Sequence, residues 1–465
     1  MSNKQRYILY DKNIIKGLFI LSIPVIFSNI LKSVHDLVDM YFVAKINLPI
    51  EVVDAQTASI TVTASIMGLF QALAIGLMVA GGALMSQYLG AKKYNEARRV
   101  SGQLFVSCTI VGIFCNILLY FGAPFIMKLM NAEGLIYDYS VIYLQYRSFE
   151  LTGLFIFYSY QATRQSTGDT LTPVILNSSS IILNIILTAV LINVFGMDIR
   201  GAALGTVIGN MIIVIPSVLL LVKSNNIEIN ISLEDIKFDK DVLKKIIILG
   251  APAAFSQALT SLGFALVNSF SMRFDDYIIT GIGAGNRINS LLLYPTMSIG
   301  GVVSTFVGQN IGAENIKRAK DSMKAGLILS LLIAVIGLFC LIPFRQNIIG
   351  ALLNEESSAL GIGSEYLMYL ILNLPCLSIF QIMNNTFQGA GRTDYSLFTS
   401  SLRLWVLRIP FIILYLDILK TNYLGLAYAM IISNIGICLV CFLLYYKVDF
   451  KPRTNKMSKK IQALG

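Results

Sequence analysis

Long apolar stretches separated by short polar segments run along nearly the whole chain. Most of them reach the roughly 20 residues that a helix needs to cross a bilayer, which is longer than a barrel strand. The pattern predicts twelve helices, near residues 14–43, 52–86, 100–121, 138–165, 171–195, 201–223, 244–272, 276–308, 321–343, 361–388, 394–419 and 422–447. We therefore expect an all-α integral membrane protein.

The composition excludes other classes of protein. The 465 residues are 55% hydrophobic and 13% charged, whereas soluble domains carry roughly 25% charged residues. An ordinary soluble enzyme, a disordered chain and a collagen-like fibre are thus excluded. The net charge of +10 does not predict a nucleic-acid partner here, because basic residues collect in the loops on one face of a membrane protein.

The basic residues also predict the orientation of the chain. In the termini, the loops and the adjoining helix ends, 25 lysines and arginines fall on the side that holds both termini, against 6 on the other side. Basic loops stay in the cytoplasm. We therefore expect a multi-pass protein of the inner (plasma) membrane, surrounded by the lipid bilayer, with both termini in the cytoplasm.

The second half of the chain repeats the first. Pro24 and Pro252 lie in similar segments, and three further pairs of segments match, with residue numbers that differ by 222, 223 and 224. These pairs are 86–99 with 308–321, 168–173 with 391–396, and 201–210 with 425–434. Each copy holds six helices, so both copies have the same orientation in the membrane. Two pseudo-symmetric six-helix lobes around a central cleft are the expected result.

The repeat sets the expected domain boundaries. Residues 1–223 form the N-terminal lobe, and the polar stretch 224–243 is a cytoplasmic linker. Residues 244–447 form the C-terminal lobe, and 448–465 form a basic cytoplasmic tail.

The first predicted helix carries Lys32, His35, Asp36 and Asp39 within the apolar stretch. At 100° per residue these side chains share one 120° stripe with Asn29, which cannot face lipid. Lys32 and Asp36 are four residues apart and are expected to pair. For Asp39 a function is favoured, because a carboxylate at this depth either takes up a proton or binds a hard cation.

Other charges in predicted helices have structural explanations. Arg147 and Glu150 are three residues apart and are expected to pair. Arg403 and Arg408 are expected to anchor their helix through backbone carbonyls or linker acids. The repeat places Val267 at the depth of Asp39, so the ion site belongs to the N-terminal lobe alone.

Signals for catalysis are weak. The chain has one histidine, and its six cysteines all lie in apolar stretches, which favours small core residues over a zinc site. The DxxD formed by Asp36 and Asp39 has no second acidic motif to complete a magnesium-diphosphate site. We therefore expect neither an enzyme nor a cofactor.

Several motifs together resemble the multidrug and toxic compound extrusion (MATE) transporters. They are PVIFSNILKSVHDLVDMYFVAKI (24–46), SQYLGAKKYNEARR (86–99), STGDTLTPVILNSSSIILNIIL (166–187) and GAALGTVIGN (201–210), with echoes at 307–320 and 388–410. The resemblance implies a monomeric two-lobe exporter that exchanges Na⁺ or H⁺ for lipophilic or cationic small molecules by alternating access.

The resemblance also implies ion-coupling residues. Asp39 matches the family's first-helix aspartate, and Asn184 and Thr206 match the asparagine and threonine of the branch with an N-lobe ion site. These three would hold Na⁺ if the transporter is sodium-coupled. Thr188 replaces a second aspartate of that branch, and Thr260 replaces a glutamate of another branch. Lys32, His35 and Asp36 are accessory candidates.

An alternative within the same superfamily is a flippase for lipid-linked oligosaccharides. It would use Arg147, Arg287 and Arg403 to hold a diphosphate. A strongly cationic cleft would favour the flippase, whereas a mainly apolar cleft with Asp39 would favour the exporter.

Overall fold

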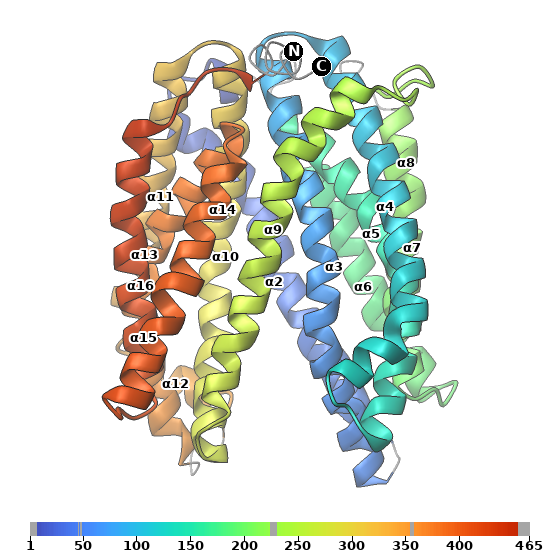
Figure 1. Cartoon of the computed structure of the whole chain (residues 1–465), viewed down its shortest axis with the longest axis vertical. Helices are drawn as coiled ribbons and strands as arrows, with labels where there is room; N and C mark the ends of the chain where they lie inside the picture. The colour runs from blue at the N-terminus through green and yellow to red at the C-terminus, as the bar shows by residue number, and fades with distance from the viewer. Residues whose placement is uncertain (1–6, 45, 47–48, 224–229, 354–357, 454–465) are drawn as a thin grey trace. The chain divides into compact units, whose positions relative to one another are not determined.

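The computed structural model describes residues 7–44, 46, 49–223, 230–353 and 358–453; the side chains of residues 34–41 and 44 lie outside the description. Regular structure in the described ranges is helical, which confirms the all-α prediction (Figure 1). The helices are α2 (Ile14–Ala44), α3 (Ile50–Gly90), α4 (Tyr94–Leu129), α5 (Gly134–Ser166), α6 (Leu171–Asn193), α7 (Ile199–Ile212), α8 (Val214–Val222), α9 (Lys240–Ser271), α10 (Asp276–Gly312), α11 (Ile316–Leu341), α12 (Arg345–Gly350), α13 (Ala359–Gly389), α14 (Thr393–Ser401), the π-helix η2 (Leu402–Arg408), α15 (Ile409–Ile413), the π-helix η3 (Leu414–Ile418) and α16 (Leu424–Lys447).

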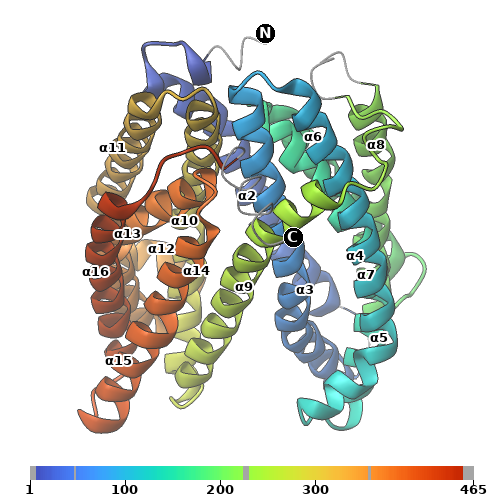
Figure 2. The same ribbon diagram turned by 45° about the horizontal axis from the view of Figure 1, so that its top comes forward.

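Eleven helical runs in the described residues are long and apolar enough to cross a membrane. The sequence predicts twelve, and the difference is α5, which has 33 residues but is not among the eleven. Helix α5 packs against α3, α4, α6, α7 and α8 (Figure 2). It is therefore largely surrounded by protein, which explains how it accommodates Arg147 and Glu150.

Two compact units make up the chain. The N unit is Phe27–Ala258, and the C unit joins Met1–Ile26 to Leu259–Gly465. Helix α13 is central to the C unit, where it packs against α10, α11, α12, α14 and α16. The lobe boundaries that the repeat predicts, 1–223 and 244–447, stay a prediction.

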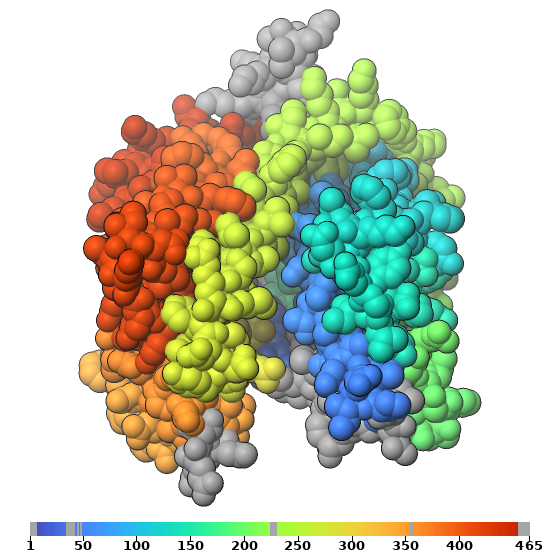
Figure 3. Space-filling model, turned by 60° about the horizontal axis from the view of Figure 1, so that its bottom comes forward, coloured from blue at the N-terminus to red at the C-terminus, as the bar shows by residue number. Residues whose placement is uncertain are grey.

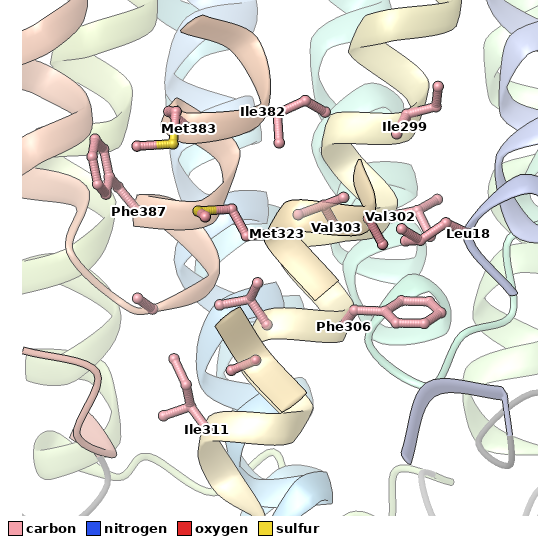
Figure 4. Packing of buried hydrophobic residues seen from close by; sticks show 14 of the residues in the cluster. Leu18, Ile299, Val302, Val303, Phe306, Ile311, Met323, Ile382, Met383 and Phe387 are labelled. Atoms are coloured by element: carbon pink, nitrogen blue, oxygen red, sulfur yellow. The ribbon is translucent and has the colours of Figure 1, made fainter. Parts of the chain in front are cut away.

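The main apolar core of the C unit includes the beginning of the chain. Leu18 of α2 packs with Val302 and Phe306 of α10, and the cluster continues through α11 and α13 to Phe387 (Figure 4). Arg318 fixes this end of the chain, since its guanidinium donates hydrogen bonds to the carbonyls of Tyr7, Ile8 and Asp11. The first half of α2 therefore belongs structurally to the second repeat.

The first half of α9 makes the reciprocal contact in the N unit. A methyl group added to Gly76 of α3 would lie only 2.4 Å from the Cβ atom of Ala254, so the two helices approach very closely. Lys245 Nζ lies 3.2 Å from the hydroxyl of Tyr88. Each repeat thus packs the first part of its leading helix on the second helix of the other repeat. The two units divide α2 and α9 shortly after Pro24 and Pro252.

The backbone confirms the repeat at matching turns. Lys92 and Glu314 occupy equivalent positions in the pair of segments 86–99 and 308–321, and both have a left-handed backbone, with φ of 57° and 59°. Gly168 and Gly391 open the next matching pair of segments and have φ of 85° and 67°. Left-handed φ at equivalent positions reflects equivalent turns between helices.

Helix α4 presents an apolar face outward. Ile110, Phe114, Phe121 and Phe125 recur at helical spacing, and each exposes between 62% and 75% of its surface. Figure 3 shows α4 on the outside of the N unit. Such a face suits contact with acyl chains.

The cysteines were predicted to be core residues. Cys340 is exposed, contrary to that prediction, whereas Cys108, Cys115, Cys438 and Cys441 are buried as predicted.

Candidate functional site

Helices α6 and α7 bring Asn184 and Thr206 together, as the resemblance implied. The Nδ2 atom of Asn184 donates a hydrogen bond of 2.8 Å to Oγ1 of Thr206, which itself donates to the carbonyl of Ala202. Asn184 exposes 2% of its surface and Thr206 exposes 4%. Two oxygen-bearing side chains from separate helices therefore meet in the interior of the N unit.

Two glycines of the GAALGTVIGN motif allow this contact. A methyl group added to Gly205 would lie 2.5 Å from Oγ1 of Thr188, and one added to Gly209 would lie 3.1 Å from Cβ of Asn184. Side chains at these positions would push α7 away from α6. The glycines thus set the distance at which Asn184, Thr188 and Thr206 face one another.

Thr188 lies one turn beyond Asn184 on the same side of α6. It is fully buried, and its Oγ1 atom has no hydrogen-bond partner among the described residues. A buried hydroxyl without a partner costs about 1–3 kcal/mol. Its oxygen is available to a bound cation or water.

A second polar layer lies one turn away and was not predicted. The hydroxyl of Ser180 donates to Oδ1 of Asn210, and Nδ2 of Asn210 lies 3.5 Å from Oε2 of Glu150. Ser180 and Asn184 are four residues apart on α6, as Thr206 and Asn210 are on α7. This four-residue spacing in both helices is the sequence signal that would have revealed a continuous polar strip.

The predicted pair of Arg147 with Glu150 is confirmed. An Nη2–Oε1 distance of 2.7 Å joins them, and Glu150 exposes only 1% of its side chain. Arg147 also donates to the hydroxyl of Tyr143. Since Arg147 is neutralised in this way, the structure does not favour its use for a diphosphate in the flippase alternative.

The charged stripe of the first helix is only partly described. The backbone of α2 is helical through Asp39, as predicted, but the side chains of His35, Asp36 and Asp39 lie outside the described residues. Lys32 is described and exposed. Thr260 is half-buried in α9. The ion-coupling roles of these residues and of Asn184, Thr188 and Thr206 stay predictions.

The register between α2 and α6 is nevertheless fixed by contacts on both sides of Asp39. Asn177 donates a hydrogen bond of 2.9 Å to Ser28, and Val43 shares a buried cluster with Ile192. Both contacts join positions whose numbers differ by 149, so the two helices run parallel. The same offset places the backbone of Asp39 at the level of Thr188.

The arginines of the eleventh predicted helix find partners other than those expected. Arg408 donates to Oγ of Ser433 and Oδ1 of Asn434, and Arg403 stacks on the ring of Phe380. Among the described residues these contacts are not backbone carbonyls or linker acids, and the anchoring role stays a prediction. The partners lie on neighbouring helices, where local sequence spacing gives no information about them.

Comparison with known proteins covers both halves of the chain. The sequence model of the MatE family matches residues 24–190 and 252–414. A probable multidrug resistance protein of Bacillus subtilis, YpnP, is 24% identical, with 90% of this chain and 92% of that protein aligned. The multidrug export protein MepA of Staphylococcus saprophyticus is 23% identical over 84% of this chain and 85% of that protein.

A solved structure shares the fold. It is an outward-facing multidrug resistance MATE family transporter of the MOP superfamily, and it superposes with a TM-score of 0.88. The alignment covers 99% of both chains at 18% identity.

Proposed function

The chain belongs to the MatE family, and from this premise we propose that it exports lipophilic, often cationic compounds in exchange for Na⁺ or H⁺. It is a multi-pass membrane transporter and not an enzyme. The relatives that carry multidrug names support export of varied small molecules. We place it as a monomer in the inner (plasma) membrane, with both termini in the cytoplasm.

The register of α2 on α6 carries this proposal. It sets Asp39 level with Thr188, one turn from the contact between Asn184 and Thr206. A carboxylate that reaches these buried hydroxyl and amide oxygens would be stabilised by a proton or a hard monovalent cation. Lys32, His35 and Asp36 stay accessory to this site.

The ion site has one matched carboxylate, because Thr188 stands where the related branch has a second aspartate. One Na⁺ or one H⁺ would therefore neutralise Asp39 completely. For Na⁺, the oxygens of Asn184, Thr188 and Thr206 would complete the coordination, since hard cations prefer oxygen ligands. For H⁺, the same groups would serve as hydrogen-bond partners of the protonated carboxyl.

Ion uptake is coupled to export if the outward-facing and inward-facing conformations bind the ion with different affinity. Ion uptake from outside would neutralise Asp39 and allow α2 to bend near Pro24, where the helix lacks one backbone hydrogen bond. This bend would release the exported compound, and return of the ion to the cytoplasm would reset the site. One charge entering at 100 mV supplies about 2.3 kcal/mol.

The test is ethidium transport by the purified protein in proteoliposomes, with sodium and proton gradients imposed separately. The gradient that drives transport identifies the ion. Asp39→Asn keeps the size of the side chain but removes its charge, and we expect it to reduce transport to the level of empty liposomes.

Asp54→Asn is the matched control. Asp54 is an exposed carboxylate in the first turns of α3, so its replacement should leave transport unchanged. Ethidium transport by Asp39→Asn at the normal rate would remove Asp39 from the mechanism. Transport that ignores both gradients would remove ion exchange altogether.

A further inference from the structure

Two arginines lie deep within one helical run of the C unit. Arg403 and Arg408 expose 5% and 1% of their surface, and they follow Thr393, where the run begins, by ten and fifteen residues. At 1.5 Å per residue they are about 15 Å and 23 Å along the run, which spans the middle of a 30 Å hydrocarbon core. Fixed cations at this depth require compensation.

Arg408 is compensated by neutral polar groups. Its Nε donates to Oγ of Ser433 at 3.1 Å, and its Nη2 donates to Oδ1 of Asn434 at 3.0 Å. Both acceptors belong to α16. Two hydrogen bonds therefore hold Arg408 in place, although no negatively charged group among the described residues contacts it.

Arg403 has a different environment. Its guanidinium carbon lies 4.3 Å from the ring centroid of Phe380 and 5.9 Å from that of Phe264. Its Nε atom is buried without a hydrogen bond, and no ion pair of Arg403 occurs among the described residues. Stacking on aromatic faces compensates only part of the cost of burying a cation.

No carboxylate of the described C unit is placed to neutralise Arg403. Every described aspartate and glutamate there lies in a loop or within about two turns of a helix end. The described ion pairs of this unit, Arg273 with Asp417 and Arg392 with Asp394, lie at such ends.

The backbone around Arg403 is held in place, so the side chain is not free to reach the membrane surface by a shift of its helix. A methyl group added to Gly263 of α9 would lie 3.1 Å from Leu404, and one added to Gly436 of α16 would lie 3.1 Å from Leu407. These close approaches clamp the π-helix η2 from two sides. The buried position of Arg403 is therefore a property of the packing.

We propose that Arg403 binds a monovalent anionic group in the interior of the C unit, with Arg408 as the second positive charge of the site. Both guanidinium carbons lie within 6.0 Å of the centroid of the Phe264 ring, so the two charges lie near one aromatic side chain. The rings of Phe264 and Phe380 make the site amphipathic and favour a carboxylate carried by a lipophilic compound. A free chloride ion shares the charge but not the apolar part.

As a statement about substrates, this inference rests on the proposed export function: compounds that bear a carboxylate would be accepted alongside cations. The binding itself does not depend on transport. A binding measurement without any gradient therefore separates the failure of this inference from the failure of ion-driven export.

The experiment compares benzoate with benzamide, its neutral counterpart of nearly the same shape, on the purified full chain in gluconate buffer at pH 7. A ligand that binds only the folded state raises the unfolding temperature. We expect benzoate to raise it and benzamide to leave it unchanged. A shift with chloride, and competition between chloride and benzoate, would show that the site accepts free anions as well as carboxylates.

Variants assign the effect to Arg403. Arg403→Gln should raise the apparent dissociation constant for benzoate at least about tenfold, whereas Arg403→Lys, which keeps the charge, should retain most of the binding. Arg273→Gln removes an exposed arginine of the same unit and should leave benzoate binding intact.

Three results would overturn the proposal. They are equal shifts with benzoate and benzamide, no shift with either benzoate or chloride, and undiminished benzoate binding by folded Arg403→Gln. Should Arg403→Gln fail to fold, the benzoate and benzamide comparison on the unaltered chain still decides.

Discussion

The two repeats place a neutral and a positively charged side chain at equivalent positions. In the register that aligns 201–210 with 425–434, Asn184 of the N unit corresponds to Arg408 of the C unit. The partner helices carry Asn210 and Asn434 at matching positions. In the N unit the amide of Asn184 donates to Thr206 and that of Asn210 lies 3.5 Å from Glu150. In the C unit the guanidinium of Arg408 donates to Asn434.

The comparison shows that one scaffold can hold different charges at equivalent positions. In the N unit the polar strip is neutral apart from the paired Arg147 and Glu150, which is compatible with the proposed cation site. In the C unit the side chain of Arg408 itself supplies a fixed positive charge. The π-helix η2 ends at Arg408, and a π-turn accommodates one extra residue, in keeping with the change of offset from 223 to 224.

The largest expected effect on stability comes from removing the buried carboxylate of the N unit, which leaves Arg147 without this negative partner, as Arg408 is without one among the described residues of the C unit. Glu150→Gln would leave the half-buried guanidinium of Arg147 without its carboxylate. We expect the free energy of unfolding to fall by about 3 kcal/mol, because breaking a buried pair leaves an uncompensated charge. Thermal or denaturant unfolding in detergent measures it.

The control removes a carboxylate from an exposed pair of the C unit. Asp417→Asn breaks the contact with Arg273, in which both side chains are about half exposed, and should cost less than about 1 kcal/mol. Equal losses of unfolding free energy in the two variants would show that the burial of Glu150 does not strengthen its pair with Arg147.

An intermediate effect is expected where the repeats differ by one methyl group. Gly205 corresponds to Ala429, which is fully buried in the C unit. Gly205→Ala would force its Cβ to 2.5 Å from Oγ1 of Thr188, and we expect a loss of about 1–3 kcal/mol of unfolding free energy. Gly82→Ala, where nothing lies within 4 Å, should instead stabilise α3 by about 0.5–1 kcal/mol. A neutral Gly205→Ala would contradict the close contact of α6 and α7.

The smallest expected effect concerns the unpartnered hydroxyl of the N unit. Thr188→Val keeps the shape and removes Oγ1, so the free energy of unfolding should rise by about 1 kcal/mol. If Na⁺ drives transport, the loss of one oxygen ligand should raise the Na⁺ concentration for half-maximal transport about tenfold. Thr188→Ser keeps the oxygen and should behave normally. An unchanged Na⁺ dependence in Thr188→Val would exclude Thr188 as a ligand.

Structural features that depend only on residues close together in the sequence could be predicted from local patterns. Apolar stretches predict the helices, and the spacing of Arg147 and Glu150 predicts their pair. The repeat predicts equivalent segments, and Lys92 and Glu314 in one such pair share a left-handed backbone. Helix α5 departs from the apolar criterion because protein, and not lipid, surrounds most of it.

Contacts between helices are less accessible to sequence reasoning. The strip from Ser180 through Asn210 to Glu150 depends on how α5, α6 and α7 are rotated against one another. The partners of Arg408 depend on the π-helix, which departs from the 100° advance of an α-helix and so turns the side chain to a face that regular periodicity does not predict.

The exchange of leading helices between the repeats means that cutting the chain within 224–243 would not yield two self-sufficient pieces. The front fragment would carry the start of α2 without α10 and α11, and the rear fragment would carry the start of α9 without α3. Each would expose an apolar surface that only the other can cover. The arrangement is that of a swapped dimer whose two subunits have been fused into one polypeptide.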